Sequence, residues 1–278
     1  MSMSMSNYLS GLASYNNMVA GHNLSGIRNY IGTTNDQYLV SLIHPQGHTA
    51  KIPTMMPISS TTAQLKYNFT ITPNTTGKFV LVVDPFQNVG YLSVDNTLDG
   101  SGTGSWTTIN FGQDATIVDQ WRLVSAGIQL RYFGNFNVMS GIFVAATTSN
   151  VSNGTADTFK TFQNIEDLSN KKVINCMDGV SMIYSPMDTK ATDFSSSSTY
   201  TNNNHPCKWQ YLFVVYGDLF PNQSCIRVDF VRNIEYTTFP NYREYITQTT
   251  AVPEMYNAPI GLETVTTLNN VSASGINT

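Results

Sequence analysis

The chain has 278 residues, of which 41% are hydrophobic and 12% aromatic, so it is long enough and apolar enough to bury a sizeable core. Only 12% of the residues are charged, which is about half the usual quarter of a globular protein. A surface built mainly from Ser, Thr, Asn and Gln hydrates well but repels little, which suits a protein that packs against copies of itself. A secreted β domain with a polar surface would have the same composition, so both interpretations stay open.

Charge and cysteine content narrow the function classes. The net charge is −4, and the first cationic side chain is Arg28, so a basic N-terminal arm is missing. This argues against a dedicated nucleic-acid binder that relies on many phosphate contacts. Cys176, Cys207 and Cys225 are odd in number and none lies in a CxxC motif, which favours free thiols in a reducing compartment. We expect neither a signal peptide in MSMSMSNYLSGL nor a membrane-spanning helix.

The first third of the chain is predicted to contain an arm, an irregular segment and two strands. Residues 1–35 are polar with scattered apolar side chains, so we interpret them as an arm. Three prolines in residues 36–60 disfavour regular structure there. Residues 66–72 alternate, with Tyr67, Phe69 and Ile71 facing inward, and residues 79–83 form a second strand. A long loop is expected from there to about residue 117.

Residues 118–147, VDQWRLVSAGIQLRYFGNFNVMSGIFVAAT, are the most informative stretch. From Arg122 to Tyr132 the side chains alternate with a period of two, as in a half-buried strand. Gly134 and Asn135 supply a turn, and residues 138–146 are apolar at nearly every position, as in a strand covered on both faces. We therefore expect an antiparallel hairpin, which needs further strands to bury its apolar surface.

The remaining elements complete an all-β fold. They are predicted, in chain order, as a helix over 156–170, two short strands within 173–184, a polar loop over 195–204, a buried strand over 209–216 and a long strand over 226–236. The resulting fold class is all-β, an eight-stranded antiparallel jelly-roll sandwich with one short helix in a connection and extended N- and C-terminal arms. The predicted organisation is an arm and lead-in segment over 1–60, a jelly-roll domain over 61–240 and an arm over 241–278.

Four segments, in order along the chain, carry motifs of one protein group. They are YLVSLIHPQGHTAKIP at 38–53, WRLVSAGIQLRYFGNFNVMSGIFVAAT at 121–147, FQNIEDLSNKKV with DGVSMIYSPMD within 162–188, and YLFVVYGDLFPNQSCIRVDFVRNIEYTTFP at 211–240. They resemble the lead-in segment, the central hairpin, the following helix and strand, and the closing strands of icosahedral viral coat proteins. That group comprises the noda-like and tombus-like RNA viruses and related single-stranded DNA viruses.

The resemblance implies a viral capsid protein that self-assembles into an icosahedral shell around the genome. Its partners would be many identical subunits, with weak or indirect contact to RNA or DNA and none to a membrane. It would be a virion component made in the host cytoplasm or nucleus. The alternative is a lectin-like or cytokine-like jelly-roll binding module. An enzyme is not expected, because GxSxG, HExxH and Asp-Thr/Ser-Gly motifs are missing from the sequence.

The chain departs from the group in two respects. The Arg/Lys-rich arm that neutralises the genome in related proteins is missing, and the residues after Pro240 are too few for a protruding domain. The chain therefore looks like a bare shell domain. Direct genome contact would fall to scattered cations such as Arg28, Lys51 and Lys66, although solvated surface charges explain them equally well.

One metal site is suggested by residue type. Asp95 and Asp99, in VDNTLDGSG, offer hard oxygen ligands from a loop, which suits Ca²⁺. The resemblance implies such ions at subunit contacts, and an ordinary acidic turn is the alternative. His44 and His48 have no further Cys or His nearby to complete a zinc site. No other cofactor is expected.

Overall fold

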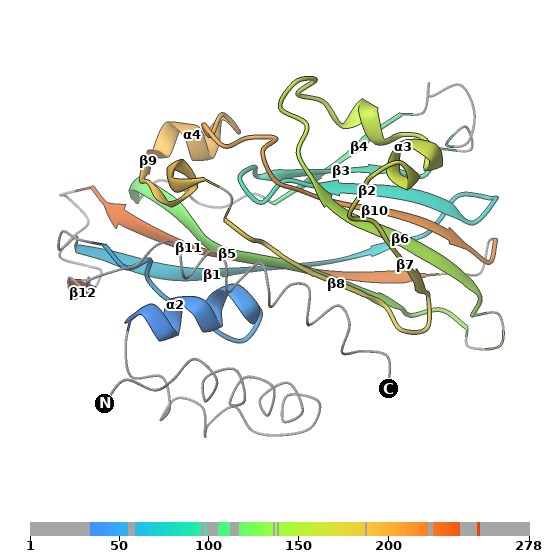
Figure 1. The fold of residues 1–278 in the computed structure, drawn as a ribbon, viewed down its shortest axis with the longest axis horizontal. Coiled ribbons are helices and arrows are strands. Elements are labelled where there is room, and N and C mark those ends of the chain that lie inside the picture. The colour runs from blue at the N-terminus through green and yellow to red at the C-terminus, as the bar shows by residue number, and fades with distance from the viewer. Residues whose placement is uncertain are drawn as a thin grey trace.

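The computed structural model describes residues 34–54, 59–95, 98, 105–111, 117–135, 137, 139–186, 188–221, 225–239 and 249–250. Their strands form two antiparallel sheets that pack face to face (Figure 1). The strands are β1 (Ser59–Ile71), β2 (Lys78–Val83), β3 (Val89–Ser93), β4 (Thr107–Asn110), β5 (Val118–Tyr132), β6 (Gly141–Thr148), β7 (Lys172–Asn175), β8 (Val180–Ile183), β9 (Ser195–Ser196), β10 (Leu212–Leu219), β11 (Ile226–Thr238) and β12 (Thr249–Thr250). The helices are α2 (Thr34–Ile43), η3 (Ala156–Phe159), α3 (Phe162–Glu166), η4 (Thr189–Thr192) and α4 (Ser197–Thr201).

The strand order is that of a jelly roll. The first sheet runs β12-β1-β11-β5-β8 with β9 beside β5, and the second runs β4-β3-β2-β10-β6-β7. Four strands of one sheet, β1, β11, β5 and β8, thus face β2, β10, β6 and β7 of the other. The chain changes sheet between β1 and β2, β4 and β5, β5 and β6, β7 and β8, β9 and β10, and β10 and β11. The eight-stranded jelly-roll prediction is confirmed, with β3 and β4 extending the second sheet and β9 and β12 only two residues long.

Two hydrophobic cores explain why the second sheet is so apolar. Phe79, Leu81 and Val83 of β2 point between the sheets, and Val80 and Val82 point to the outer face. The outer face is covered by η3, α3 and the aromatic side chains around them, so β2 is buried on both sides. A strand covered on both faces carries a continuous apolar run rather than an alternating one. The same reasoning accounts for β6 and β10.

The predicted hairpin of residues 118–147 is wrong, although both of its strands exist. β5 and β6 lie in different sheets, where β5 pairs with β11 and β6 pairs with β10. Sequence adjacency and a short connection favoured pairing the two strands with each other. The alternating β5 belongs to the first sheet, and the continuously apolar β6 belongs to the second sheet, which is covered on both faces. Each of them pairs with a strand from the C-terminal half of the chain.

Four local predictions are also wrong in whole or in part. Residues 34–43 form helix α2, because the prolines begin only at Pro45, after the helix has ended. The loop expected up to residue 117 contains β3 and β4, which are too short to show a clear period. The polar loop over 195–204 contains helix α4, and the helix expected over 156–170 is divided into η3 and α3. Thr161 caps α3 by accepting a hydrogen bond from the Asn164 backbone, which starts a new helix there.

The lead-in segment packs on the outer face of the first sheet. Helix α2 lies across this face in Figure 1, and Tyr38 and Leu42 of the helix are buried in the main core cluster. The contact is close at Gly127 of β5, where an added Cβ would lie 2.6 Å from Pro45 Cγ. The boundaries 1–60, 61–240 and 241–278 stay predictions, and most of both arms lies outside the described residues.

We expect Gly127→Val to destabilise the fold by about 1–3 kcal/mol, because the larger side chain would push Pro45 away from the sheet. Urea unfolding followed by circular dichroism measures the change. Thr70→Val, at an exposed position of β1, is the matched control and should change stability by less than about 0.5 kcal/mol. Equal stability of Gly127→Val and the wild-type chain would contradict this tight contact.

Candidate functional site

A buried ion pair joins the two central strands of the first sheet. Arg122 of β5 lies opposite Glu235 of β11, and its Nε and Nη2 donate to Glu235 Oε2 at 2.9 and 2.7 Å. The two side chains are 5% and 0% exposed. A carboxylate removed from water in this way needs further hydrogen bonds to be stable. The lead-in segment and the start of β1 supply these hydrogen bonds.

The ion pair holds the lead-in segment against the sheet. Glu235 Oε2 accepts a hydrogen bond from Ile52 N at 3.0 Å, and Arg122 Nη2 donates to Ile52 O at 2.9 Å. Ser60 Oγ donates to the other carboxylate oxygen of Glu235. Arg122 Nη1 donates to Thr192 O at 3.0 Å, so the same guanidinium also fixes η4. One charged pair therefore joins five parts of the chain: β5, β11, the lead-in segment, the start of β1 and η4.

A β-bulge aims Arg122 at this position. The pairing of β5 with β11 shifts between Asn233 and Ile234, which face Ser125 and Leu123 and leave Val124 as the extra residue. An extra residue in one strand reverses the side to which the preceding residues point. Arg122 and Ser125 therefore both face the lead-in segment, although a regular strand would place them on opposite faces.

A second polar network fixes the start of the same segment. Ser41 Oγ of α2 lies 2.7 Å from Ser125 Oγ, and Asn233 Nδ2 donates to Ser125 Oγ at 2.8 Å. Asn233 Nδ2 also donates to the carbonyl oxygens of Pro45 and His48 at 2.8 and 3.0 Å. These polar groups are buried and bonded to one another. Residues 41–52 are thus held to the sheet by side chains of two strands.

The cations predicted to contact nucleic acid are not brought together. Arg28 lies outside the described residues. Lys51 Nζ donates to Ser60 O at 2.6 Å, and partial burial lowers the pKa of its ammonium, against the attraction of Glu235. Lys66 is exposed on β1, six residues beyond Ser60, which is about 20 Å along a strand. A role of these residues at the genome stays a prediction.

The predicted metal ligands are described only in part. Asp95 Oδ2 accepts hydrogen bonds from Ser105 N at 3.1 Å and Ser105 Oγ at 3.4 Å, so its carboxylate shapes the start of β4. Asp99 lies outside the described residues. Within the described ranges, no cluster of three or more His, Cys, Asp or Glu residues is arranged to hold a metal ion. The calcium site stays a prediction.

Sequence reasoning missed a buried group of titratable side chains between the sheets. His205 is 3% exposed and stacks on Phe86 at 4.7 Å between ring centres. Its Nδ1 accepts from Cys207 N at 3.0 Å, so the proton sits on Nε2, which lies 3.0 Å from Ser195 Oγ. Burial lowers the pKa of His205 to about 4. A neutral imidazole that donates to a serine does not activate it as a nucleophile.

Asp84 is the acidic member of this group. It is fully buried after β2 and accepts hydrogen bonds from Phe86 N at 2.9 Å, Trp209 N at 2.8 Å and Gln87 Nε2 at 2.6 Å. Burial raises the pKa of Asp84 to about 6 against these donors. The sequence analysis gave Asp84 no role beyond ending a strand, because its contact with Trp209 joins two positions that are 125 residues apart. Its hydrogen bond from Trp209 N holds the residues just before β10 in place, which is a structural role.

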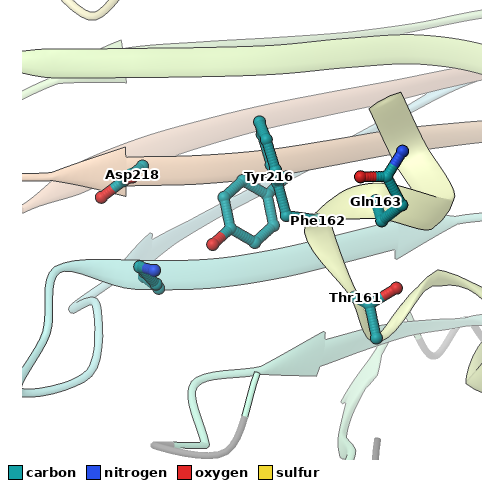
Figure 2. Close-up of a pocket in the computed structure, with 6 residues that line it drawn as sticks. Thr161, Phe162, Gln163, Tyr216 and Asp218 are labelled. Carbon is teal, nitrogen blue, oxygen red and sulfur yellow. The ribbon is translucent and has the colours of Figure 1, made fainter. Parts of the chain in front are cut away.

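A shallow hollow lies on the outer face of the second sheet. It has a volume of about 310 Å³ and is lined by Lys78, Thr161, Phe162, Gln163, Tyr216 and Asp218. Figure 2 shows the rings of Phe162 and Tyr216 side by side between α3 and β10. Their ring centres are 4.9 Å apart, so much of the apolar lining is already used in an aromatic contact. The hollow offers little enclosed apolar surface to a ligand.

Comparisons with known proteins bear on the fold. No model of a protein family matches the sequence, and no curated protein matches it. Among solved structures, the chain is similar to the T=1 particles derived from infectious bursal disease virus, with a TM-score of 0.63 and 11% identity over 84% of this chain and 91% of that one. It is also similar to the VP2 subviral particle of that virus, with a TM-score of 0.61 and 11% identity over 86% and 95% of the two chains. The T13 particle of the same virus gives a TM-score of 0.60, with 11% identity over 88% and 98%.

The chain has the fold of these virus-particle subunits. The similarity extends over nearly the whole of each compared chain, so it includes both sheets and their connections. The described part of the chain contains no helix long and apolar enough to cross a membrane.

We expect Arg122→Ala to destabilise the protein by about 3–5 kcal/mol, because it leaves the Glu235 carboxylate buried without its cation. The free energy of unfolding in urea measures the loss. Arg131→Ala is the control, since Arg131 is 59% exposed and lies 3.9 Å from Asp229, a pair worth less than about 1 kcal/mol. Similar losses in the two variants would contradict the role of the buried pair.

The low pKa of His205 predicts a loss of stability in acid. His205 binds a proton near pH 6.5 in the unfolded chain but only near pH 4 in the folded chain. The stability that neutral His205 contributes is therefore complete above pH 6.5 and is lost as the pH falls towards 4. The total loss is about 3 kcal/mol. Asp84 has the opposite effect on stability below pH 6. Because its pKa is raised in the folded chain, the folded chain takes up a proton there before the unfolded chain does, which stabilises the fold as the pH falls. We expect His205→Gln to lose less stability than the wild type between about pH 7 and 4.5 in urea unfolding. Parallel pH profiles of the two proteins would contradict this assignment.

Proposed function

We propose that the chain is a viral capsid protein that self-assembles through repeated jelly-roll contacts into an icosahedral shell. The observation that carries the proposal is the whole-chain structural similarity to subunits of infectious bursal disease virus particles. The similarity includes 91–98% of the length of those chains, so it extends to both sheets rather than to one of them.

The finer proposal is that the chain belongs with the noda-like and tombus-like coat proteins and related single-stranded DNA virus capsids. It rests on the four sequence segments described above. Two residues of those segments form the buried ion pair, Arg122 in the central Arg-Leu-Val-Ser-Ala-Gly strand and Glu235 in the closing Glu-Tyr-Thr. Both residues bind Ile52 of the lead-in segment, so the pair links three of the four sequence segments in this chain.

The geometry suits assembly from rigid units. The lead-in segment is fixed to the first sheet by two buried polar networks, so most of the described chain behaves as one body. A closed shell needs subunits whose contacts repeat under rotation, and rigid bodies repeat them with little entropic cost. The low fraction of charged residues reduces repulsion between copies. Genome contact through Arg28, Lys51 and Lys66, and Ca²⁺ held by Asp95 and Asp99, belong to the proposal as secondary features.

The alternatives receive less support from the residues that the structure describes. A lectin-like or cytokine-like module needs a ligand site, and the hollow beside Phe162 is shallow and partly filled by its own rings. An enzyme needs an activated group, and the contact between Ser195 and His205 has the wrong polarity for that.

The purified chain is expected to form large particles of uniform diameter under negative-stain electron microscopy and to elute far ahead of a monomer in size-exclusion chromatography. Rigid subunits with repeated contacts close into such shells. The measurement covers several salt concentrations and pH values, with and without added Ca²⁺. A monodisperse species of 30.7 kDa under all of these conditions would rule the proposal out.

A further inference from the structure

Two exposed arginines lie side by side on the outer face of the first sheet, beyond the contact between Gly127 and Pro45. Arg131 of β5 and Arg227 of β11 are directly opposite each other in the antiparallel pairing, so both side chains leave the sheet on the same face. They are 59% and 51% exposed. Like charges at directly opposite positions destabilise a sheet. The pair therefore costs the fold stability unless negative charge lies close to both side chains.

A single carboxylate serves both arginines. Asp229 of β11 lies on the same face, and its Oδ1 accepts a hydrogen bond from Arg227 Nε at 3.1 Å. Its Oδ2 lies 3.9 Å from Arg131 Nη2. The Asp229 side chain is only 18% exposed, so both arginine side chains are far more open to solvent than the acid between them. Two positive charges against one negative charge leave this cluster with an excess of positive charge.

Neighbouring side chains anchor each guanidinium group at one edge. Gln129, which is paired with Asp229, accepts a hydrogen bond from Arg131 Nη2 at 2.6 Å, and Asp229 anchors Arg227 through Nε. In the part of the chain that the structure describes, both Nη groups of Arg227 and the Nη1 and Nε of Arg131 donate to no other residue. A guanidinium that is fixed at one edge and open at the other is pre-organised to bind an anion through parallel hydrogen bonds.

We propose that Arg131 and Arg227 together bind one doubly charged phosphate group, either inorganic phosphate or a phosphate monoester. The guanidinium fork matches the spacing of phosphate oxygens, and two forks can hold one group between them. The charges also match. The two arginines and Asp229 give +1, and Lys66, exposed on the same face of β1, raises this to +2. A phosphate monoester carries about −1.5 to −2 at pH 7. The proposed site does not depend on self-assembly.

The residues around the pair favour a single phosphate group over a nucleic-acid strand. A strand presents one phosphate after another, and its affinity comes from many cations along its path. Here Asp229 lies among the cations and would repel the next phosphate of a strand. The neighbouring positions on this face are Thr70, Asn68 and Gln129, which offer no aromatic ring on which a base could stack. The face is therefore suited to one compact, doubly charged group.

The test measures binding of two phosphate probes to the purified chain. Inorganic phosphate and O-phosphoserine are titrated separately in phosphorus NMR, at one pH and at constant ionic strength. We expect Arg131→Gln and Arg227→Gln each to weaken the affinity for either probe by about tenfold or more, because each removes one charge-assisted fork. Both variants should keep the circular dichroism spectrum of the wild type, since the replaced side chains are exposed. A preference for one probe would identify the source of the phosphate group and support the site.

Two further variants separate binding by the fork from general attraction between charges. Arg227→Lys keeps the positive charge but loses the planar fork, so we expect the affinity for phosphate to fall by about threefold or more. Lys172→Gln is the matched control, because it removes an exposed cation from β7 of the other sheet. This variant should bind both probes as the wild type does. Unchanged affinity in Arg227→Lys would overturn the assigned geometry.

Three other results would also overturn the site. The first is an equal loss of affinity in Lys172→Gln, since binding would then follow net charge alone. The second is no measurable binding of either probe by the wild-type chain at about 10 mM. The third is tighter binding of a short oligothymidine without terminal phosphates through the same two arginines, which would assign the site to a phosphodiester strand. Particle formation by the wild-type chain is measured separately, so failure of the phosphate site leaves the capsid proposal standing.

Discussion

The buried ion pair between Arg122 and Glu235 is the interaction on which the rest of the structure depends. Removing two charges from water is costly, and their mutual attraction offsets this only when the remaining donors and acceptors are also satisfied. Here the peptide of Ile52 and the hydroxyl of Ser60 complete the shell of Glu235. An apolar pair would fill the same volume, but it would not specify which residue of the lead-in segment docks there. The ion pair therefore adds a specific position to the docking of a segment whose apolar side chains, such as Leu42 and Ile52, are buried in the core.

Local periodicity predicted most strands, because burial on one face or on both leaves a pattern within a few residues. The pairing of β5 and β6 could not be read in this way, since their partners, β11 and β10, lie in the last quarter of the chain. The bulge at Val124 could not be predicted from the sequence pattern either. The alternation around Ser125 assigns Arg122 to the core, and only the register against β11 shows that it points to the lead-in segment.

The candidate sites were harder to predict than the strands, and for a physical reason. Residue type alone suggested Lys51, Lys66 and Asp95, but the chemistry of a charged group depends on what surrounds it. Lys51 and Asp95 each bind a neighbouring backbone group, which no spacing rule reveals. Conversely, no motif marked His205 or Asp84, because their burial depends on contacts with distant residues, Phe86 for His205 and Trp209 for Asp84. In this chain the charged residues with the strongest constraints are those that hold connections in place.

This use of charge also bears on assembly. The chain has few charged residues, yet Asp84, Arg122, Arg232 and Glu235 are all buried. Arg232, for example, donates to Gln87 O at 2.8 Å. Placing these groups inside leaves the surface with still fewer charges than the composition suggests. A surface with few charges repels its own copies weakly, and the proposed self-assembly requires close approach of identical subunits.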